Sequence, residues 1–232
     1  MKVKTYYASV DALVDHEMFF NAYARVSQYR RNKVDQCKSI GKKVLSLGAE
    51  LLLSAALLDI ELLAAPLCFK EGEYGKPELV DNNIHFNFSH SGNRVMCTIS
   101  TKDVGCDVEK MCNIDLVLAM KHLADGEQNI IKMINDPDKQ IHAFYRIWTL
   151  KESFIKTIGL GLTQKLDSFS IDIGKSITVN QDFDNEQYHF MEYNLGDGYC
   201  YAVCSKDPDI ERTMVHVDFN ELFSKMSRIN SV

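Results

Sequence analysis

The sequence predicts an α+β fold made of two similar halves, each with helices packed on a small antiparallel sheet. Two runs of elements support this prediction. The first run has a strand-like start at 3–10, then helical patterns, then alternating strands up to residue 100. The second starts with an alternating stretch at 104–110, passes through helical patterns and ends in further strands. We therefore expect halves at 1–102 and 103–232, with a functional site between them.

Composition limits the class of protein. The chain has 232 residues, of which 46% are hydrophobic and 25% charged, so it can bury a core. A net charge of −6 argues against a broad nucleic-acid surface. The start of the sequence has no signal-peptide pattern, and the longest charge-free part of the most apolar segment, 51–58, is too short to span a bilayer. We expect a cytoplasmic protein without a membrane partner.

The seven cysteines predict neither a disulfide framework nor a zinc site. Their number is odd, and no Cys-x-x-Cys pair occurs. The first half also carries helical patterns at 15–30 and within 44–69. Between these two lies a run of positive charge formed by Arg30, Arg31, Lys33, Lys38, Lys42 and Lys43. Such a run is usually a solvated face, unless an anion binds beside it.

Polar residues interrupt the strand pattern that begins at 84. Ser89-His90-Ser91-Gly92-Asn93 brings hydroxyl groups, an imidazole and a glycine together. A turn of this composition could bind an anion through its amides and hydroxyls, although a plain hairpin connection explains it equally well.

Two carboxylates follow on the next strand. Alternation places Val104, Cys106 and Val108 on one face, and Gly105, Asp107 and Glu109 on the other. Neighbouring carboxylates repel unless a cation or a proton lies between them. Their hard oxygen atoms suit Mg²⁺ or Mn²⁺ better than zinc.

A long helix from about 138 to 158 is the centre of the second half. Asp136 and Pro137 are a helix-start signal, and the glycines at 159 and 161 end the helix. The helix carries Trp148, Lys151, Glu152 and Lys156 within about two turns. The simplest interpretation is an amphipathic core helix with a Glu152–Lys156 surface pair. Further strands are expected at 169–173, 177–180, 188–193 and 199–204, with a hairpin turn at 196–198.

Four stretches in order closely resemble the 4′-phosphopantetheinyl transferases of the surfactin-synthetase-activating type. They are Tyr74-Gly75-Lys76-Pro77, Phe86-Asn87-Phe88-Ser89-His90-Ser91-Gly92, Val104-Gly105-Cys106-Asp107-Val108-Glu109-Lys110 and residues 144–156 with Trp148-Thr149-Leu150-Lys151-Glu152 at their centre. The resemblance implies two α+β halves with coenzyme A between them. It also implies transfer of the phosphopantetheine arm to a serine of an apo acyl or peptidyl carrier protein, with release of adenosine 3′,5′-bisphosphate.

The resemblance also implies roles for particular residues. Asp107, Glu109 and Glu152 would hold Mg²⁺, or Mn²⁺, against the pyrophosphate, while Lys151 and Lys156 would neutralise its oxygens. Glu152 would be the base for the carrier serine. The coenzyme would be bound by two further groups. Gly75, Lys76 and Pro77 would contact the adenine, and the 3′-phosphate would be bound by Ser89, His90, Ser46 and the cations Arg30, Lys33 and Lys43.

Two other functions are compatible with the same residues. One is a non-catalytic module that binds coenzyme A or a carrier protein, and the other is a general Mg²⁺ phosphohydrolase. We expect no nucleic-acid partner, and a monomer, because a chain with two similar halves can form its own site between them.

Overall fold

The computed structural model describes residues 1–232 apart from 64–66, 73–75, 81–82, 162–163 and 230–232. The first half contains β1 (Lys4–Ser9), α1 (His16–Arg25), α2 (Gln28–Gln36), α3 (Ile40–Asp59), β2 (Phe69–Glu71), β3 (Pro77–Leu79), β4 (His85–Ser91) and β5 (Arg94–Ser100). The second contains β6 (Val104–Lys110), α4 (Leu116–Ala119), α5 (Asp125–Lys132), α6 (Pro137–Ile158), β7 (Ser170–Ile173), β8 (Ile177–Asn180), β9 (His189–Tyr193) and β10 (Tyr199–Ser205). The chain then continues through β11 (Val215–His216) and α7 (Phe219–Ile229).

The two halves share one topology, which confirms the predicted α+β class. Each half runs strand, three helices, a small hairpin and then two antiparallel strands, and in each the first strand pairs with the last one. The sheet orders are accordingly β1-β5-β4 and β6-β10-β9. The third helix is the long one in both halves, with 20 residues in α3 and 22 in α6. The small hairpin is β2–β3 in the first half and β7–β8 in the second.

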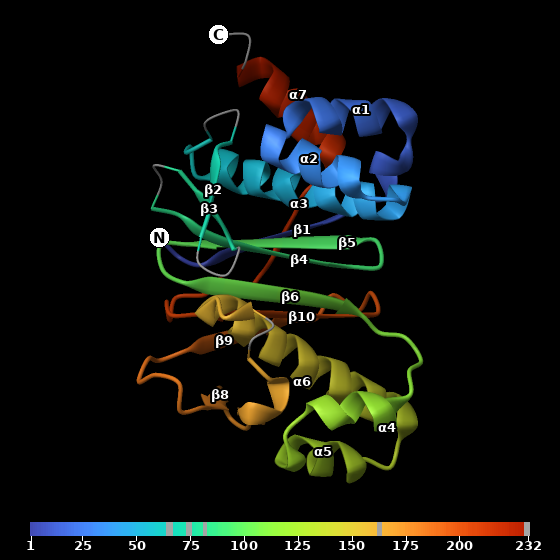
Figure 1. Ribbon diagram of the computed structural model, residues 1–232, viewed down its shortest axis with the longest axis vertical. Helices are drawn as coiled ribbons and strands as arrows, with labels where there is room; N and C mark the ends of the chain where they lie inside the picture. The colour runs from blue at the N-terminus through green and yellow to red at the C-terminus, as the bar shows by residue number, and fades with distance from the viewer. Residues whose placement is uncertain (64–66, 73–75, 81–82, 162–163, 230–232) are drawn as a thin grey trace.

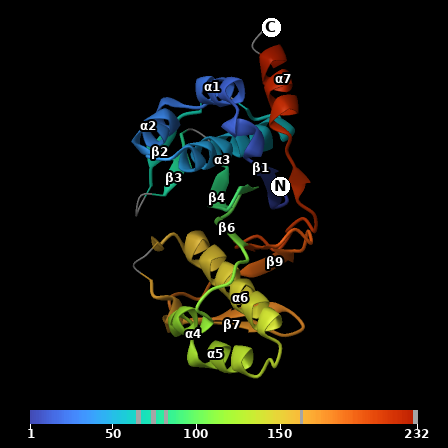
Figure 2. The ribbon, with the colours of Figure 1, turned by 90° about the vertical axis from the view of Figure 1, so that its right-hand side faces the viewer.

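The halves stack in four layers, helices, sheet, sheet and helices (Figure 1). Helices α1, α2 and α3 cover the outer face of the first sheet, and α6 covers the outer face of the second; the view in Figure 2 agrees. A separate apolar cluster fills the space between the sheets, with Met96 from β5, Val104 and Val108 from β6, and Tyr201 from β10. The predicted split of β6 into an apolar face and a carboxylate face is therefore confirmed.

The end of the chain corrects the expected boundary of the second half. Strand β11 pairs in parallel with β1, so that Val215 is the partner of Tyr6. Helix α7 then buries Phe219, Leu222 and Phe223 in the core of the first half. Residues from 215 onward therefore belong structurally to the first half, because they cover the free edge of β1 and its apolar surroundings.

Helix boundaries also differ from the sequence expectation. The expected helix at 15–30 is two helices, since Ser27 accepts a hydrogen bond from the Arg30 amide and caps α2. The helical pattern expected within 44–69 is helix α3. This helix starts earlier, at Ile40, where Ser39 caps it, and it ends at Asp59. Helix α6 begins after Asp136 and stops at Gly159, whose φ is +75°, as its flanking residues predict. Among the described residues, no helix is long and apolar enough to cross a membrane.

Candidate active site

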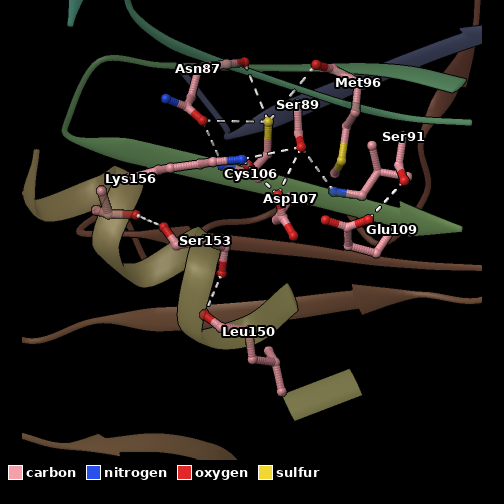
Figure 3. A network of polar contacts seen from close by, with 12 residues as sticks. Asn87, Ser89, Ser91, Met96, Cys106, Asp107, Glu109, Leu150, Ser153 and Lys156 are labelled. Atoms are coloured by element: carbon pink, nitrogen blue, oxygen red, sulfur yellow. Dashed lines mark hydrogen bonds and ion pairs between the residues drawn. The ribbon is translucent and has the colours of Figure 1, made fainter. Parts of the chain in front are cut away.

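The candidate site lies where β4 of the first half meets β6 of the second. No backbone ladder joins these strands. Instead, side-chain oxygens at alternate positions of β4 accept the outward-facing amides of β6 (Figure 3). Asn87 accepts from Cys106 at 3.1 Å, Ser89 from Val108 at 3.2 Å and Ser91 from Lys110 at 3.1 Å. We call this contact the β4–β6 seam.

Asp107 is the buried carboxylate of the seam. One of its oxygens, Oδ1, accepts hydrogen bonds from Ser89 at 2.8 Å and from the Lys156 ammonium at 2.6 Å. The other oxygen, Oδ2, is buried and has no hydrogen-bond partner in the described part of the chain. A buried carboxylate oxygen without a partner is unfavourable, so Oδ2 of Asp107 lacks a donor or a cation that the described residues do not supply.

Helix α6 reaches the seam because Gly105 has no side chain. A Cβ at Gly105 would collide with the Ser153 carbonyl oxygen and would lie 2.5 Å from the Thr157 amide nitrogen. Helix and strand therefore touch backbone to backbone, which brings Lys156 against β6. Its ammonium donates to the Cys106 carbonyl at 3.1 Å as well as to Asp107. Burial opposes the charge of Lys156, but Asp107 holds its pKa above the ordinary value.

Glu109 and Glu152 complete the acidic group. Burial and the charge of Asp107 raise the pKa of both carboxyl groups. Ser91 donates to Glu109 at 2.7 Å (Figure 3). As arranged, however, the described residues contain no group of three acidic, imidazole or thiol side chains that could hold a metal ion. The three predicted metal ligands are therefore brought to one region without forming a closed ligand set.

A cavity of about 570 Å³ adjoins the acidic group. Its lining includes Glu152 and Lys156 from α6 together with His122, Ile155, Lys165 and Leu166. Glu152 therefore connects the buried acids of β6 with an open space on the second half.

A basic group lies on the first-half side of the seam. Arg30 is buried, pairs with Glu50 at 3.3 Å and approaches the Ser46 hydroxyl at 3.4 Å. His90 is exposed on the face of β4 opposite Ser89. Partial desolvation, together with the charges of Lys156 and Arg30, lowers the pKa of His90. Arg30 and Ser46 therefore lie together on the first-half side, and the charges of Arg30 and Lys156 both act on His90, so an anion near His90 would meet positive charge.

The other two predicted cations lie at the edge of this group. Lys33 is exposed on α2, with its ammonium 4.5 Å from the centre of the Tyr29 ring. Lys43 is half-buried on α3, one turn before Ser46. Arg30 is therefore the predicted cation that the fold holds most firmly, because Glu50 fixes its guanidinium.

The structure corrects the role expected of Lys151. Its side chain is fully buried, and its ammonium donates to both carboxylate oxygens of Glu127, at 2.6 and 2.7 Å, and to the Phe169 carbonyl at 2.6 Å. Burial lowers the pKa of Lys151 against the effect of Glu127. Lys151 points away from the seam and joins α5, α6 and the start of β7, so it has no free ammonium for a pyrophosphate.

Lys76 also has a structural position. Its ammonium donates to the carbonyls of Val104 at 3.2 Å and Lys156 at 2.9 Å, near the C-terminal end of α6. Burial lowers the pKa of Lys76. Pro77 lines a separate cavity of about 640 Å³ next to Lys76. Gly75, the third member of the predicted adenine-side loop, lies outside the described residues.

Of the two interpretations of residues 89–93, the structure shows the hairpin connection. Strand β4 continues through Ser91 and pairs with β5, and the turn between them is formed by Gly92 and Asn93. The hydroxyls of Ser89 and Ser91 act through the seam. Sequence reasoning missed Asn87 and Ser91, although the alternation of Asn87, Ser89 and Ser91 matches that of Asp107 and Glu109 on the neighbouring strand.

Comparison with known proteins identifies consistent relatives. Residues 103–204 match the model of the 4′-phosphopantetheinyl transferase superfamily. The 4′-phosphopantetheinyl transferase Sfp of Bacillus subtilis (strain 168) is 34% identical over 179 residues, which cover 76% of this chain and 80% of that protein. The 4′-phosphopantetheinyl transferase gsp of Aneurinibacillus migulanus is 32% identical over 207 residues, which cover 88% and 86%.

Proposed function

The chain belongs to the 4′-phosphopantetheinyl transferase superfamily and transfers the phosphopantetheine arm of coenzyme A to carrier proteins, and we propose that Asp107, Glu109 and Glu152 hold a divalent cation for this reaction. The observation that carries the proposal is the buried Oδ2 of Asp107, which has no hydrogen-bond partner among the described residues. This atom belongs to a group of three carboxylates, and ligand atoms that are all oxygen suit Mg²⁺ or Mn²⁺.

The open arrangement of the acids agrees with this choice of cation. Mg²⁺ is commonly held by one or two carboxylates together with substrate phosphates and water, rather than by a cage made only of protein ligands. A cation bound there would neutralise charge on the pyrophosphate of coenzyme A. Asp107 would hold it through Oδ2, while Oδ1 keeps its bonds to Ser89 and Lys156.

The protein groups can accomplish the rest of the transfer. The carrier serine oxygen attacks the phosphorus next to the pantetheine arm, and Glu152 accepts the serine proton. The bond from this phosphorus to adenosine 3′,5′-bisphosphate breaks, and the bisphosphate leaves with the bonding electron pair. Lys156, whose ammonium donates to Ser89, Cys106 and Asp107 while its side chain is 27% exposed, would stabilise charge that develops on the phosphate oxygens.

The charged groups suggest the orientation of coenzyme A. We place its 3′-phosphate at Arg30, Ser46 and His90, and its adenine near Lys76 and Pro77, all on the first-half side. The pyrophosphate then lies over the seam, and the arm points toward the cavity at Glu152. This leaves the second-half side of the site for the carrier serine.

The test is the intact mass of an apo carrier protein after incubation with coenzyme A, Mg²⁺ and either wild type or Asp107→Asn. Wild type should add one phosphopantetheine arm, and a chelator should prevent it. Asp107→Asn should slow the transfer by about 100-fold or more, because the substitution removes a charged ligand while keeping the shape. Asp59→Asn, which removes a carboxylate bonded to Lys4 and Tyr6, is the control and should remain active.

The outcomes separate the parts of the proposal. Transfer that persists at the wild-type rate in Asp107→Asn would reject the metal assignment. Transfer insensitive to chelator would reject the need for a divalent cation. Release of the bisphosphate without a modified carrier would favour a phosphohydrolase.

A further inference from the structure

The β4–β6 seam gives one serine a role beyond holding the two halves together. Three side chains of β4 bond to amides of β6, but they differ in what else they contact (Figure 3). In the described structure Asn87 has no hydrogen bond to an acid; its other partner in the seam is the Cys106 thiol. Ser89 and Ser91 each also donate to a carboxylate, at 2.8 Å to Asp107 and 2.7 Å to Glu109.

The direction of the Ser91 hydroxyl is fixed by its two partners. Its oxygen accepts the Lys110 amide at 3.1 Å, so the single hydroxyl hydrogen is left to donate. The acceptor is Glu109 Oε2. Lys110 follows Glu109 directly on β6, so backbone and side chain of the same short segment are bonded to one hydroxyl. This bonding holds the Glu109 carboxylate near one position relative to its own strand.

Glu109 depends on Ser91 more than Asp107 depends on Ser89. Asp107 has a second partner in Lys156, at 2.6 Å. Within the described residues, Ser91 supplies the only hydrogen bond to the Glu109 carboxylate. Because Glu109 is half-buried and a glutamate has three rotatable side-chain bonds, losing that bond would free several orientations.

We propose that Ser91 is a positioning residue that orients Glu109 for the divalent cation, so that one hydroxyl both closes the seam and sets the geometry of an acidic ligand. The inference rests on the proposed metal-dependent function. Residues that hydrogen-bond to a metal ligand fix its orientation, and their loss typically weakens metal affinity by roughly 10- to 100-fold.

The experiment measures binding of Mn²⁺ to the protein with coenzyme A present, from the electron paramagnetic resonance signal of free Mn²⁺. Coenzyme A alone supplies the baseline. Ser91→Ala should weaken Mn²⁺ affinity by roughly 10-fold or more. Asn87→Ala is the matched control, because it also removes one side chain from a β6 amide but leaves the acids untouched. We expect its Mn²⁺ affinity to stay within about 3-fold of wild type.

A second pair of variants separates orientation from folding. Ser91→Thr keeps the hydroxyl. Ser91→Val introduces a side chain of nearly the same shape as threonine but without the hydroxyl. The Ser91→Thr variant should bind Mn²⁺ with an affinity within about 3-fold of wild type, and Ser91→Val should bind it as weakly as Ser91→Ala. The unfolding temperature of each variant is measured alongside, so that Mn²⁺ affinities are compared only for folded protein.

The results distinguish two failures. If wild type binds Mn²⁺ while Ser91→Ala and Ser91→Val bind it equally well, the inference about Ser91 is wrong and the metal site stands. The inference also fails if Asn87→Ala weakens binding as much as Ser91→Ala, since the effect would then belong to the seam. If wild type binds no Mn²⁺ above coenzyme A alone, the metal assignment falls and the role of Ser91 falls with it.

Discussion

The first strands of the two halves have the same place in the topology but different neighbours. Strand β1 pairs with β5 on one side and with β11 on the other, so both its edges are in ladders. Strand β6 pairs only with β10 in the described structure, and its outer amides bond to side chains of β4. The acids occur on β6, not on β1. An edge closed by side chains can present functional groups that an edge closed by another strand cannot.

The long helices make the same contrast. Each long helix supplies one residue of a buried ion pair. In the first half Glu50 of α3 pairs with Arg30, and in the second half Lys151 of α6 pairs with Glu127. The pair in the first half includes a cation of the basic group, whereas the pair in the second half lies in the core. Helix α6 therefore separates a structural lysine, Lys151, from a site lysine, Lys156, five residues later.

The largest effect should come from breaking the core pair of the second half. Lys151→Met leaves Glu127 buried without its cation, which should lower the free energy of unfolding by about 3–5 kcal/mol. Denaturant unfolding measures the loss. Combining it with Glu127→Gln should recover part of the stability, because the unpaired charge is removed.

Lys156→Met on the same helix is the contrasting variant. Its side chain is 27% exposed, but the variant leaves the buried Asp107 without its cation, so we expect a stability loss that is smaller than that of Lys151→Met, together with a large loss of transfer activity. If the two lysine variants lose stability equally, the distinction between a structural and a site lysine is wrong.

A smaller difference in stability is expected between alanine substitutions at Gly105 and Gly48, the glycines at the two helix–sheet contacts. Gly105→Ala forces a Cβ against the backbone of α6, including the Lys156 carbonyl carbon at 2.8 Å, and should cost about 2–3 kcal/mol. Gly48→Ala in α3 meets only side chains, with Val10 at 2.7 Å and Val95 at 3.2 Å. These can move, and alanine is a better helix former, so we expect a change within about 1 kcal/mol. Urea unfolding of both variants checks the order, which equal losses would contradict.

The smallest effect concerns pH. In the metal-free protein, burial and Asp107 raise the pKa of Glu152, so the folded state binds a proton more tightly than the unfolded state. This contribution to stability is present below the unfolded pKa, about 4.3, and is lost as pH rises through the folded pKa. At pH 7 Glu152 is ionised, so its burial beside Asp107 lowers the stability of the metal-free protein.

Glu152→Gln should remove that cost and raise the unfolding temperature of the metal-free protein at pH 7 by about 1–3 °C. The difference from wild type should shrink as pH falls toward the unfolded pKa. Calorimetry at several pH values measures it, with Glu17→Gln in the first turn of α1 as the exposed control. A Glu152→Gln protein that is less stable than wild type at pH 7 would contradict the direction of the shift.

The sequence predicted the elements whose signals are local. Alternation placed Asp107 and Glu109 on one face of β6, and Asp136 with Gly159 marked the limits of α6. The role of Lys151 was not predictable in this way, because its partner Glu127 lies 24 residues earlier and no local pattern links them. The family resemblance also assigned this lysine to the site, where its burial in the structure excludes it.

Two further differences from the sequence expectation have different origins. The polar run at 89–91 looked like the end of a strand, because period-two reasoning assumes that one face of a strand meets water or an apolar core. Here that face meets the edge of another strand, so Ser89 and Ser91 are polar inside the protein. The α7 helix, by contrast, had a readable signal, since Asp218 precedes Phe219, Leu222, Phe223 and Met226 at helical spacing.

The return of the chain end to β1 has a consequence for synthesis on the ribosome. Tyr6 of β1 acquires its β11 partner only when Val215 has been made, more than 200 residues later. Until then the nascent first half exposes one edge of β1 and the apolar surface that Phe219, Leu222 and Phe223 will cover. Contacts between such distant residues form late and slow folding. The two halves therefore cannot mature one after the other as independent domains, and the first half translated is the last to be completed.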